Sequence, residues 1–342
     1  MENRKIETEV NDMIDFCLTK FDSITDADLI EQFRKSLLAR HENISKEVFE
    51  NTYLRNLEIP QILLFDILAN RFPLVIEAQN IIGRALVESV KEKTHITILD
   101  LGIGRCIQVE RLLNLICNLP NIHYVTLIGV DISKASIDFA NKVLTDAKNK
   151  FQFKLDFHLL NSSVEEMEEL TIQNLIPKSN DFLFINASLT LHHIQSQKDR
   201  FRLFKIVSIL NPDLFTLIEP NTDFFNTKFE KRMIHAFEHF GSLFNYINTL
   251  PLLQKEKKGL KSFFSNELFD ALAVPEVSRY EKYDLSENWI SLATSLGLKI
   301  FNLNSFADQT NIHGILVENK NIDYVNFKFN ESNILGVIAF KA

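Results

Sequence analysis

The sequence lacks the features that mark several functional classes. Its three cysteines, Cys17, Cys106 and Cys117, are isolated and odd in number, so they form neither a disulfide framework nor a zinc-binding spacing. We therefore expect a reducing, cytoplasmic environment and no metal. Lysine and arginine form no run along a predicted helix, and the net charge is −8. Nucleic-acid binders normally carry a basic surface, so we expect no nucleic-acid partner.

Long uninterrupted apolar segments are also missing. The first ten residues have no apolar core and predict no secretory signal. Residues 112–130 lack charged side chains, but Asn118–Asn121 divides them into a helix and a strand, so we expect no membrane span. No internal repeat or low-complexity segment stands out. With 46% hydrophobic residues among 342, the chain can bury a full core as one large or two ordinary domains.

The stretch Ile96–Gln108 carries the strongest motif. An apolar run ends in Asp100 and breaks at once into Gly102 and Gly104, and helical spacing of apolar residues begins at Val109. This pattern predicts a buried parallel strand, a tight glycine turn and a helix N-terminus. Such a junction is where nucleotide-like ligands bind.

A second predicted strand, residues 124–131, ends in Asp131. A carboxylate there can accept hydrogen bonds from both ribose hydroxyls of an adenosine. A dinucleotide site needs a third glycine where this chain has Ile107, so S-adenosylmethionine fits better than NAD, with Asp100 pointing into the turn. Cys106 stands where the methyltransferase pattern usually has a third small residue, which predicts a narrowed cradle. The alternative is a glycine turn that binds nothing.

The chain divides into two predicted parts. Residues 1–90 predict an N-terminal helical cap, punctuated by Pro60 and Pro73. Residues 91–342 predict a doubly wound, Rossmann-type α/β core, mostly parallel with antiparallel strands at its C-terminal end. A helical lid insertion spans 222–297; it opens with a helix over 225–250, followed by a solvated loop at Lys255–Gly259. The predicted strands cover 96–101, 124–131, 153–160, 181–187, 214–218, 298–303, 314–317, 325–329 and 335–340.

The residues that follow the parallel strands should rim one cleft, because the carboxyl ends of parallel strands share one edge of a sheet. Gln79 and Asn80, just ahead of the glycine turn, are either surface amides or further cofactor contacts. The predicted cofactor-binding residues are Asp100, Gly102, Gly104, Gln108, Asp131, Ile132, Ser162, Ser163 and Asn186.

Candidate catalytic residues follow the fourth and fifth strands. His192 or His193 could act as the base that removes a proton from an accepting hydroxyl, because imidazole titrates near neutral pH. Alternatively, one of them caps the next helix or fills a hydrogen bond under the sheet. Glu219 could orient an amine or hydroxyl, act as the base, or cap a loop.

Asn221 and Arg279 are candidate substrate contacts. Arg279 could instead form an internal salt bridge with Glu281, beside an aromatic shelf at Trp289. The apolar faces of the long helix and of the N-terminal helices must both be buried. If they pack across the strand ends, they enclose a pocket of roughly several hundred Å³ beside the cofactor, lined by the candidate catalytic residues, Asn186 and Asn221.

The order and spacing of several blocks resemble the GRAS-domain family. His95–Leu101, followed by Ile107–Gln108, is similar to the family's V-H-I-I-D-F and L-Q-W blocks. The family's L-H-x-L is similar to Leu191–Ile194. Further similar blocks lie at Ala78–Ile82, Thr216–Glu219, Val277–Trp289 and Phe327–Phe340.

This resemblance covers residues from about Pro60 to the C-terminus and implies a Rossmann-type methyltransferase fold with a helical cap. Plant members of the family act mainly as transcriptional regulators and lack a full glycine turn. A chain that keeps the glycine turn, Asp100 and Asp131 resembles the bacterial branch, which is proposed to transfer methyl groups from S-adenosylmethionine to small molecules. The resemblance therefore implies such a transferase; the alternative is a catalytically silent GRAS-like ligand-binding or protein-interaction regulatory module. The substrate, pathway and oligomeric state stay open.

Overall fold

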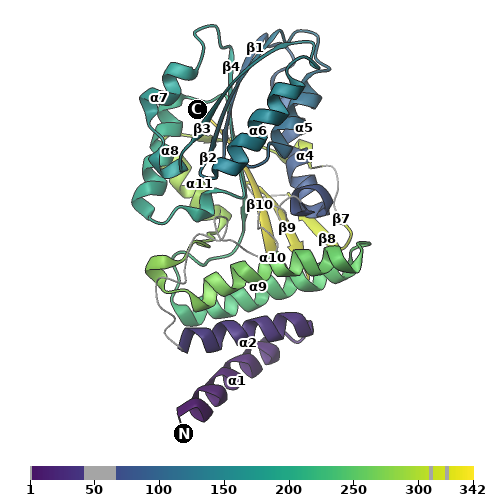
Figure 1. Ribbon diagram of the computed structural model, residues 1–342, viewed down its shortest axis with the longest axis vertical. Helices are drawn as coiled ribbons and strands as arrows, with labels where there is room; N and C mark the ends of the chain where they lie inside the picture. Colours follow the sequence, from purple (N-terminus) through teal and green to yellow (C-terminus); the bar gives the residue numbers. More distant parts are fainter. Residues whose placement is uncertain (1, 42–66, 308–310, 320–322) are drawn as a thin grey trace.

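The computed structural model describes residues 2–41, 67–307, 311–319 and 323–342, so Pro60 lies outside the described residues. The strands of the described residues form one ten-stranded sheet of order β3-β2-β1-β4-β5-β10-β9-β8-β7, with β6 paired to β10 (Figure 1). The strands are β1 (His95–Leu101), β2 (Tyr124–Asp131), β3 (Lys154–Asn161), β4 (Phe182–Ser188), β5 (Leu214–Pro220), β6 (Lys299–Ile300), β7 (Asn311–Ile312), β8 (Ile315–Glu318), β9 (Val325–Phe329) and β10 (Ser332–Lys341).

Strands β3, β2, β1, β4 and β5 are parallel, and β10 runs antiparallel to β5. The predicted α/β class and parallel central sheet are confirmed. The strand order changes direction between β1 and β4, and open α/β sheets bind ligands beyond the carboxyl ends of strands at such a point. The predicted sixth strand, 298–303, is reduced to β6, and β7 was not predicted.

Helices cover both faces of the sheet. Figure 1 shows α4, α5 and α6 on one face and α7, α8 and α11 on the other. The short 3₁₀ turns η3 (Val164–Glu166) and η4 (Leu191–His193) follow β3 and β4. The helices are α1 (Glu2–Lys20), α2 (Ala27–His41), α4 (Pro73–Ser89), α5 (Ile107–Ile116), α6 (Lys134–Ala147), α7 (Glu169–Leu175), α8 (Gln197–Leu210), α9 (Phe229–Thr249), α10 (Gln254–Ala273) and α11 (Ser286–Ser295).

Local chemistry sets where these helices begin. Ser133 caps α6 by accepting a hydrogen bond from the Ser136 amide, as its position predicts. Helix α5 begins only at Ile107, because Gly104 and Cys106 have positive φ angles of 52° and 66°.

The predicted loop Lys255–Gly259 is wrong, because these residues form the first turns of α10. The Glu256 carboxylate accepts a hydrogen bond from the Leu253 amide at 3.0 Å and thereby satisfies one of the free donors at the helix start. The burial of Leu260 and Phe263 on the same helix anchors it to the core.

Helices α1 and α2 lie at the end of the molecule away from the sheet, beneath α9 and α10 (Figure 1). Helix α2 packs on α10 and α9, and α9 packs on β10 and β9. Phenylalanines fill this interface: Phe33 meets Phe237 edge-on with ring centroids 4.9 Å apart. One apolar cluster runs from these helices to the α4–α5 side of the sheet. The N-terminal helices, α9, α10 and that face of the sheet therefore share one core.

Helix α11 belongs to the predicted insertion but packs beside α8 on the opposite face of the sheet. Trp289 stacks on Phe204, with centroids 5.8 Å apart. Of the helices in the predicted lid insertion, only α9 and α10 pack against the N-terminal helix α2. No helix in the described part of the chain is both long and apolar enough to span a membrane.

One buried carboxylate joins the N-terminal helices to α9 and α10. Asp26 caps α2 by accepting from the Leu29 amide at 3.0 Å, accepts from Asn248 at 2.6 Å, and pairs with Lys261 at 2.6 Å. Burial opposes ionisation of Asp26, but its hydrogen bonds with Lys261, Asn248 and Leu29 lower its pKa below 3.8.

We predict that Asp26→Ala lowers the free energy of unfolding by about 3 kcal/mol, because the change removes the buried carboxylate that Lys261 and Asn248 contact and leaves α2 uncapped. The matched control is Asp28→Ala, which removes the other carboxylate on Lys261; its side chain is 64% exposed, so the loss should be under about 1 kcal/mol. Urea denaturation measures both. Because the folded-state pKa of Asp26 is depressed, its contribution is complete above pH 3.8 and disappears as the pH falls through the folded-state value. Equal losses for the two variants at pH 7 contradict this account.

Candidate functional site

A cavity of about 330 Å³ lies beside the glycine turn, at the carboxyl ends of the parallel strands. It contains five of the predicted cofactor-binding residues. It is lined by Gly102, Gly104, Asp131, Ile132, Ser133, Ala135, Ser136, Ser163, Val164, Glu165, Ser188, Leu189, Thr190, His193, Gln195 and Tyr280. A volume of a few hundred Å³ is typical of small-ligand sites.

Asp131 borders this cavity at the end of β2. One carboxylate oxygen accepts from the Gly104 amide and the other from the Ser133 amide, both at 2.8 Å. Burial raises the pKa of Asp131, while these two backbone hydrogen bonds lower it. An ionised carboxylate offers about four acceptor positions. Asp131 therefore keeps the capacity to accept from two further donors, such as a pair of ribose hydroxyls.

The two glycines of the turn have different surroundings. At Gly104 the nearest atom to an added Cβ is 4.0 Å away, so its backbone is open. At Gly102, with φ +84°, an added Cβ would lie 2.1 Å from the Thr190 hydroxyl. The loop after β4 therefore covers Gly102, and only glycine fits there.

Asp100 points into the sheet and does not line the cavity. It accepts from the Asn186 amide at 2.6 Å, and the Asn186 carbonyl accepts from Thr216 at 2.9 Å and from Gln108 at 3.4 Å. Burial raises the pKa of Asp100 to about 7, although the Asn186 hydrogen bond lowers it. Asp100, Gln108 and Asn186 form a buried network behind the turn, and none of the three lines the cavity. Ser162, also a predicted contact, lies outside the lining.

Cys106 does not narrow the cavity. Its side chain is fully buried in the apolar core and is absent from the cavity lining. The φ angle of 66° preserves the backbone conformation that a glycine would adopt, which is strained for a residue with a Cβ. The predicted narrowing of the cavity by Cys106 is therefore wrong.

Glu219 holds the loop after β4. It is 1% exposed, and one carboxylate oxygen accepts from the amides of Thr190 at 3.1 Å and Leu191 at 2.8 Å. The other oxygen pairs with Nδ1 of His192 at 2.5 Å. Three donors thus hydrogen-bond to this carboxylate, which does not line the cavity. The geometry matches the loop-capping alternative for Glu219.

The two histidines of η4 have opposite surroundings. Burial lowers the pKa of His192, but the carboxylates of Glu219 and Glu281 outweigh burial and raise it to about 10. Burial and the neighbouring charge of His192 lower the pKa of His193 to about 4. His193 lines the cavity and is neutral at pH 7, whereas His192 lies behind it.

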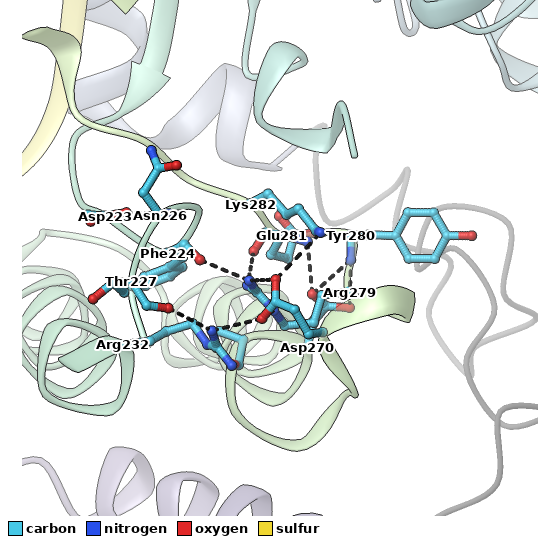
Figure 2. Close-up of polar contacts among 12 residues, drawn as sticks. Asp223, Phe224, Asn226, Thr227, Arg232, Asp270, Arg279, Tyr280, Glu281 and Lys282 are labelled. Atoms are coloured by element: carbon cyan, nitrogen blue, oxygen red, sulfur yellow. Dashed lines mark hydrogen bonds and ion pairs between the residues drawn. The ribbon is translucent and has the colours of Figure 1, made fainter. Parts of the chain in front are cut away.

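Asn221 and Arg279 make structural contacts. Asn221 is 1% exposed; it donates to Asn326 at 3.0 Å and accepts from the Ser286 amide at 2.9 Å. Arg279 is fully buried, and Figure 2 shows it donating to the carbonyl oxygens of Phe224 and Glu281. Neither lines the cavity, which is the opposite of what a substrate contact requires.

The salt bridge of Arg279 is formed with Glu276 at 2.7 Å, and Glu281 contributes only its carbonyl oxygen. Trp289 stacks elsewhere, against Phe204 and Arg200. Arg279 therefore forms an internal salt bridge, as the alternative predicted, but with Glu276 and not with Glu281. The predicted aromatic shelf of Trp289 beside it is wrong.

The two histidines predicted to line one substrate pocket line two different cavities, His193 the larger one and His192 a smaller one. A second cavity of about 40 Å³ contains His192 and Leu189 in its lining, together with apolar residues such as Phe72 and Phe264. Leu189 borders both cavities and has φ 54°. Leu189, His192 and His193 therefore separate the larger cavity from the cap.

Several lining residues were missed from the sequence. Leu189 and Thr190 follow β4, so the rule that strand ends rim the cleft could have identified them. Tyr280 comes from a segment far along the chain, after η5 (Glu276–Ser278), and carries no local signal. Gln79 binds Arg111 at 2.5 Å and Asn80 donates to Glu77 at 3.2 Å, away from the cavity.

Comparison with known proteins identifies related sequences. The sequence profile of the GRAS domain family matches residues 24–336. Chitin-inducible gibberellin-responsive protein 1 of Oryza sativa subsp. japonica is 24% identical over 80% of this chain and 50% of its own length. Scarecrow-like transcription factor PAT1 of Arabidopsis thaliana is 22% identical over 66% of this chain and 48% of its own. The chain thus spans about half the length of these relatives.

Solved structures share the fold. The crystal structure of SCL7 from Oryza sativa matches with a TM-score of 0.77 and 19% identity, covering 95% of this chain and 93% of that chain. The DszA carbon methyltransferase matches with a TM-score of 0.52 and 13% identity, covering 95% of this chain and 68% of that chain. The methyltransferase-like architecture that the glycine turn predicts is therefore confirmed.

We predict that Cys106→Gly changes the free energy of unfolding by less than about 1 kcal/mol, because relief of the left-handed backbone offsets the lost burial. Cys17→Gly is the matched control: Cys17 is also fully buried but lies inside α1, so the loss should be about 2 kcal/mol. Urea denaturation distinguishes the two. A loss at Cys106 as large as that at Cys17 contradicts the assignment.

Proposed function

The chain belongs to the GRAS domain family, and from this premise we propose that it is a catalytically silent GRAS-like regulatory module that binds an adenosyl ligand of the S-adenosylmethionine type. The observation that carries the proposal is the wall between the two cavities. On the cap side of this wall, the cavity that Leu189 and His192 line leaves only about 40 Å³ for a methyl acceptor. Sites for small ligands are usually about 300 Å³ or larger.

The ligand side of the proposal rests on the glycine turn and the end of β2. The open backbone at Gly104 allows close approach of a ligand, and Asp131 keeps acceptor capacity toward ribose hydroxyls. Ile132, 47% exposed, offers an apolar surface beside Asp131 for an adenine ring. Ser163 adds a polar side chain at the same cavity. These residues fit the adenosyl part of S-adenosylmethionine.

The regulatory role rests on the relatives, one of which is named a transcription factor. We infer that this chain regulates through contact with other proteins, because its net charge of −8 gives nucleic acid no electrostatic attraction. A cytoplasmic location and a bacterial origin remain predictions; the relatives named above are plant proteins.

A second candidate function is methyl transfer to a small molecule. It is favoured by His193, which lines the cavity and, with a pKa near 4, is unprotonated at pH 7 and able to accept a proton. Transfer of a labelled methyl group from S-adenosylmethionine to any member of a small-molecule library, abolished by His193→Ala, would establish this function in place of the silent one.

We predict that S-adenosylhomocysteine binds with a Kd in the micromolar range, roughly −8 kcal/mol. Asp131→Ala should weaken binding by about 1.5 to 3 kcal/mol, because hydrogen bonds to a charged acceptor are lost. Isothermal titration calorimetry measures both. The control is Asp138→Ala, an exposed carboxylate on α6 outside the cavity, which should bind like the parent. No heat at millimolar ligand, or equal binding by Asp131→Ala, overturns the adenosyl-ligand assignment.

A further inference from the structure

Two buried polar atoms behind the cavity wall have no hydrogen-bond partner. They are Nε2 of His192 and Oε2 of Glu281, 3.4 Å apart on side chains that are 3% and 1% exposed. Leaving a buried polar group unsatisfied costs about 1–3 kcal/mol. Two such atoms facing each other indicate that a further group binds between them.

A third donor converges on the same point. Nδ1 of His193 lies 3.8 Å from the same oxygen of Glu281. Within the described residues, His192, His193 and Glu281 form a group whose donor atoms all lie within 4.8 Å of one another. Ligand atoms about 2.0–2.1 Å from a tetrahedral zinc ion are about 3.3–3.5 Å from each other. The separations of 3.4 and 3.8 Å therefore approach metal-binding geometry with little adjustment.

Glu219 orients His192 for this role. Its carboxylate lies 2.5 Å from Nδ1 of His192, which turns the opposite ring nitrogen, Nε2, toward Glu281 at 3.4 Å. Metal-binding histidines usually have a carboxylate or carbonyl in this position. Glu219 and Glu281 also place two buried carboxylates beside one imidazole. A divalent cation bound there would balance their charge.

The position of Glu281 is equally constrained. Asp270 accepts from the Glu281 amide at 2.8 Å, and Arg279 donates to the Glu281 carbonyl oxygen at 2.9 Å, as Figure 2 shows. The Lys282 amide donates to the His192 carbonyl oxygen at 3.1 Å and joins the two segments that supply the donors. The two backbone segments that carry His192 and Glu281 are therefore held together without a metal, as a preorganised site requires.

We propose that His192, His193 and Glu281 bind one divalent first-row transition-metal ion, with zinc as the ion that this donor set suits best. Two imidazoles and one carboxylate are a common ligand set for zinc, and three protein ligands leave one coordination position free. His193, one of the three ligands, is also part of the cavity lining. The sequence predicted no metal because the ligands lie in two distant segments and include no cysteine.

The experiment uses full-length protein without a histidine tag, dialysed against a chelator and then titrated with zinc in competition with a chromophoric chelator. We expect one zinc per chain with a Kd of about 1 µM or tighter. His193→Ala and Glu281→Gln should each weaken zinc binding by at least about 100-fold. Removing a residue that only hydrogen-bonds to a metal ligand costs about 10- to 100-fold. Cobalt should give the strong visible absorption of four-coordinate Co²⁺, and His193→Ala should lose it.

The matched control is His235→Ala. His235 is a partly buried histidine on α9 whose ring contacts the Asp223 carbonyl oxygen, so its removal should leave zinc affinity unchanged. Circular dichroism verifies that each variant folds. If Glu281→Gln does not fold, His193→Ala alone tests the site, because His193 is the partly exposed ligand. No zinc uptake, or uptake that His193→Ala leaves unaltered, overturns the site. The S-adenosylhomocysteine titration is independent of this result, so either assignment can fail alone.

Discussion

The buried carboxylate of Glu219 is the interaction on which the site depends. A negative charge removed from water must be matched by donors, and Glu219 finds three of them in the loop from Thr190 to His192. This arrangement places Thr190 over Gly102, orients the ring of His192 and supports Leu189 in its left-handed conformation. The same carboxylate thus shapes the cavity and closes it toward the cap.

The cap completes the closure because it has no core of its own. The apolar side chains of α2, α9 and α10 belong to the cluster that also covers one face of the sheet. Interiors of this kind are packed as densely as organic crystals. The only space found here among the described residues that line the smaller cavity is about 40 Å³, whereas the cavity beside the glycine turn holds about 330 Å³.

The glycine turn, Asp131 and the positions of the parallel strands could be predicted from the sequence, because periodicity and the strand-end rule act over short stretches. The partner of Asp100 could not be predicted, because Asn186, which donates to it, lies on a neighbouring strand. The direction of the Cys106 side chain could not be predicted either, because it depends on one φ angle. Glu281 was noticed only as a salt-bridge candidate. Its approach to His192 arises from tertiary packing of two distant segments, for which neither segment carries a local signal.

The most direct test of the silent-module account is a crystal structure with S-adenosylhomocysteine bound. The account predicts the ribose on Asp131, the sulfur facing the wall formed by Leu189 and His193, and no cavity beyond the sulfur larger than a few tens of Å³, close to the 40 Å³ found behind the wall. A wall that moves aside to open an acceptor-sized chamber of about 300 Å³ next to the sulfur would contradict it and support a working methyltransferase.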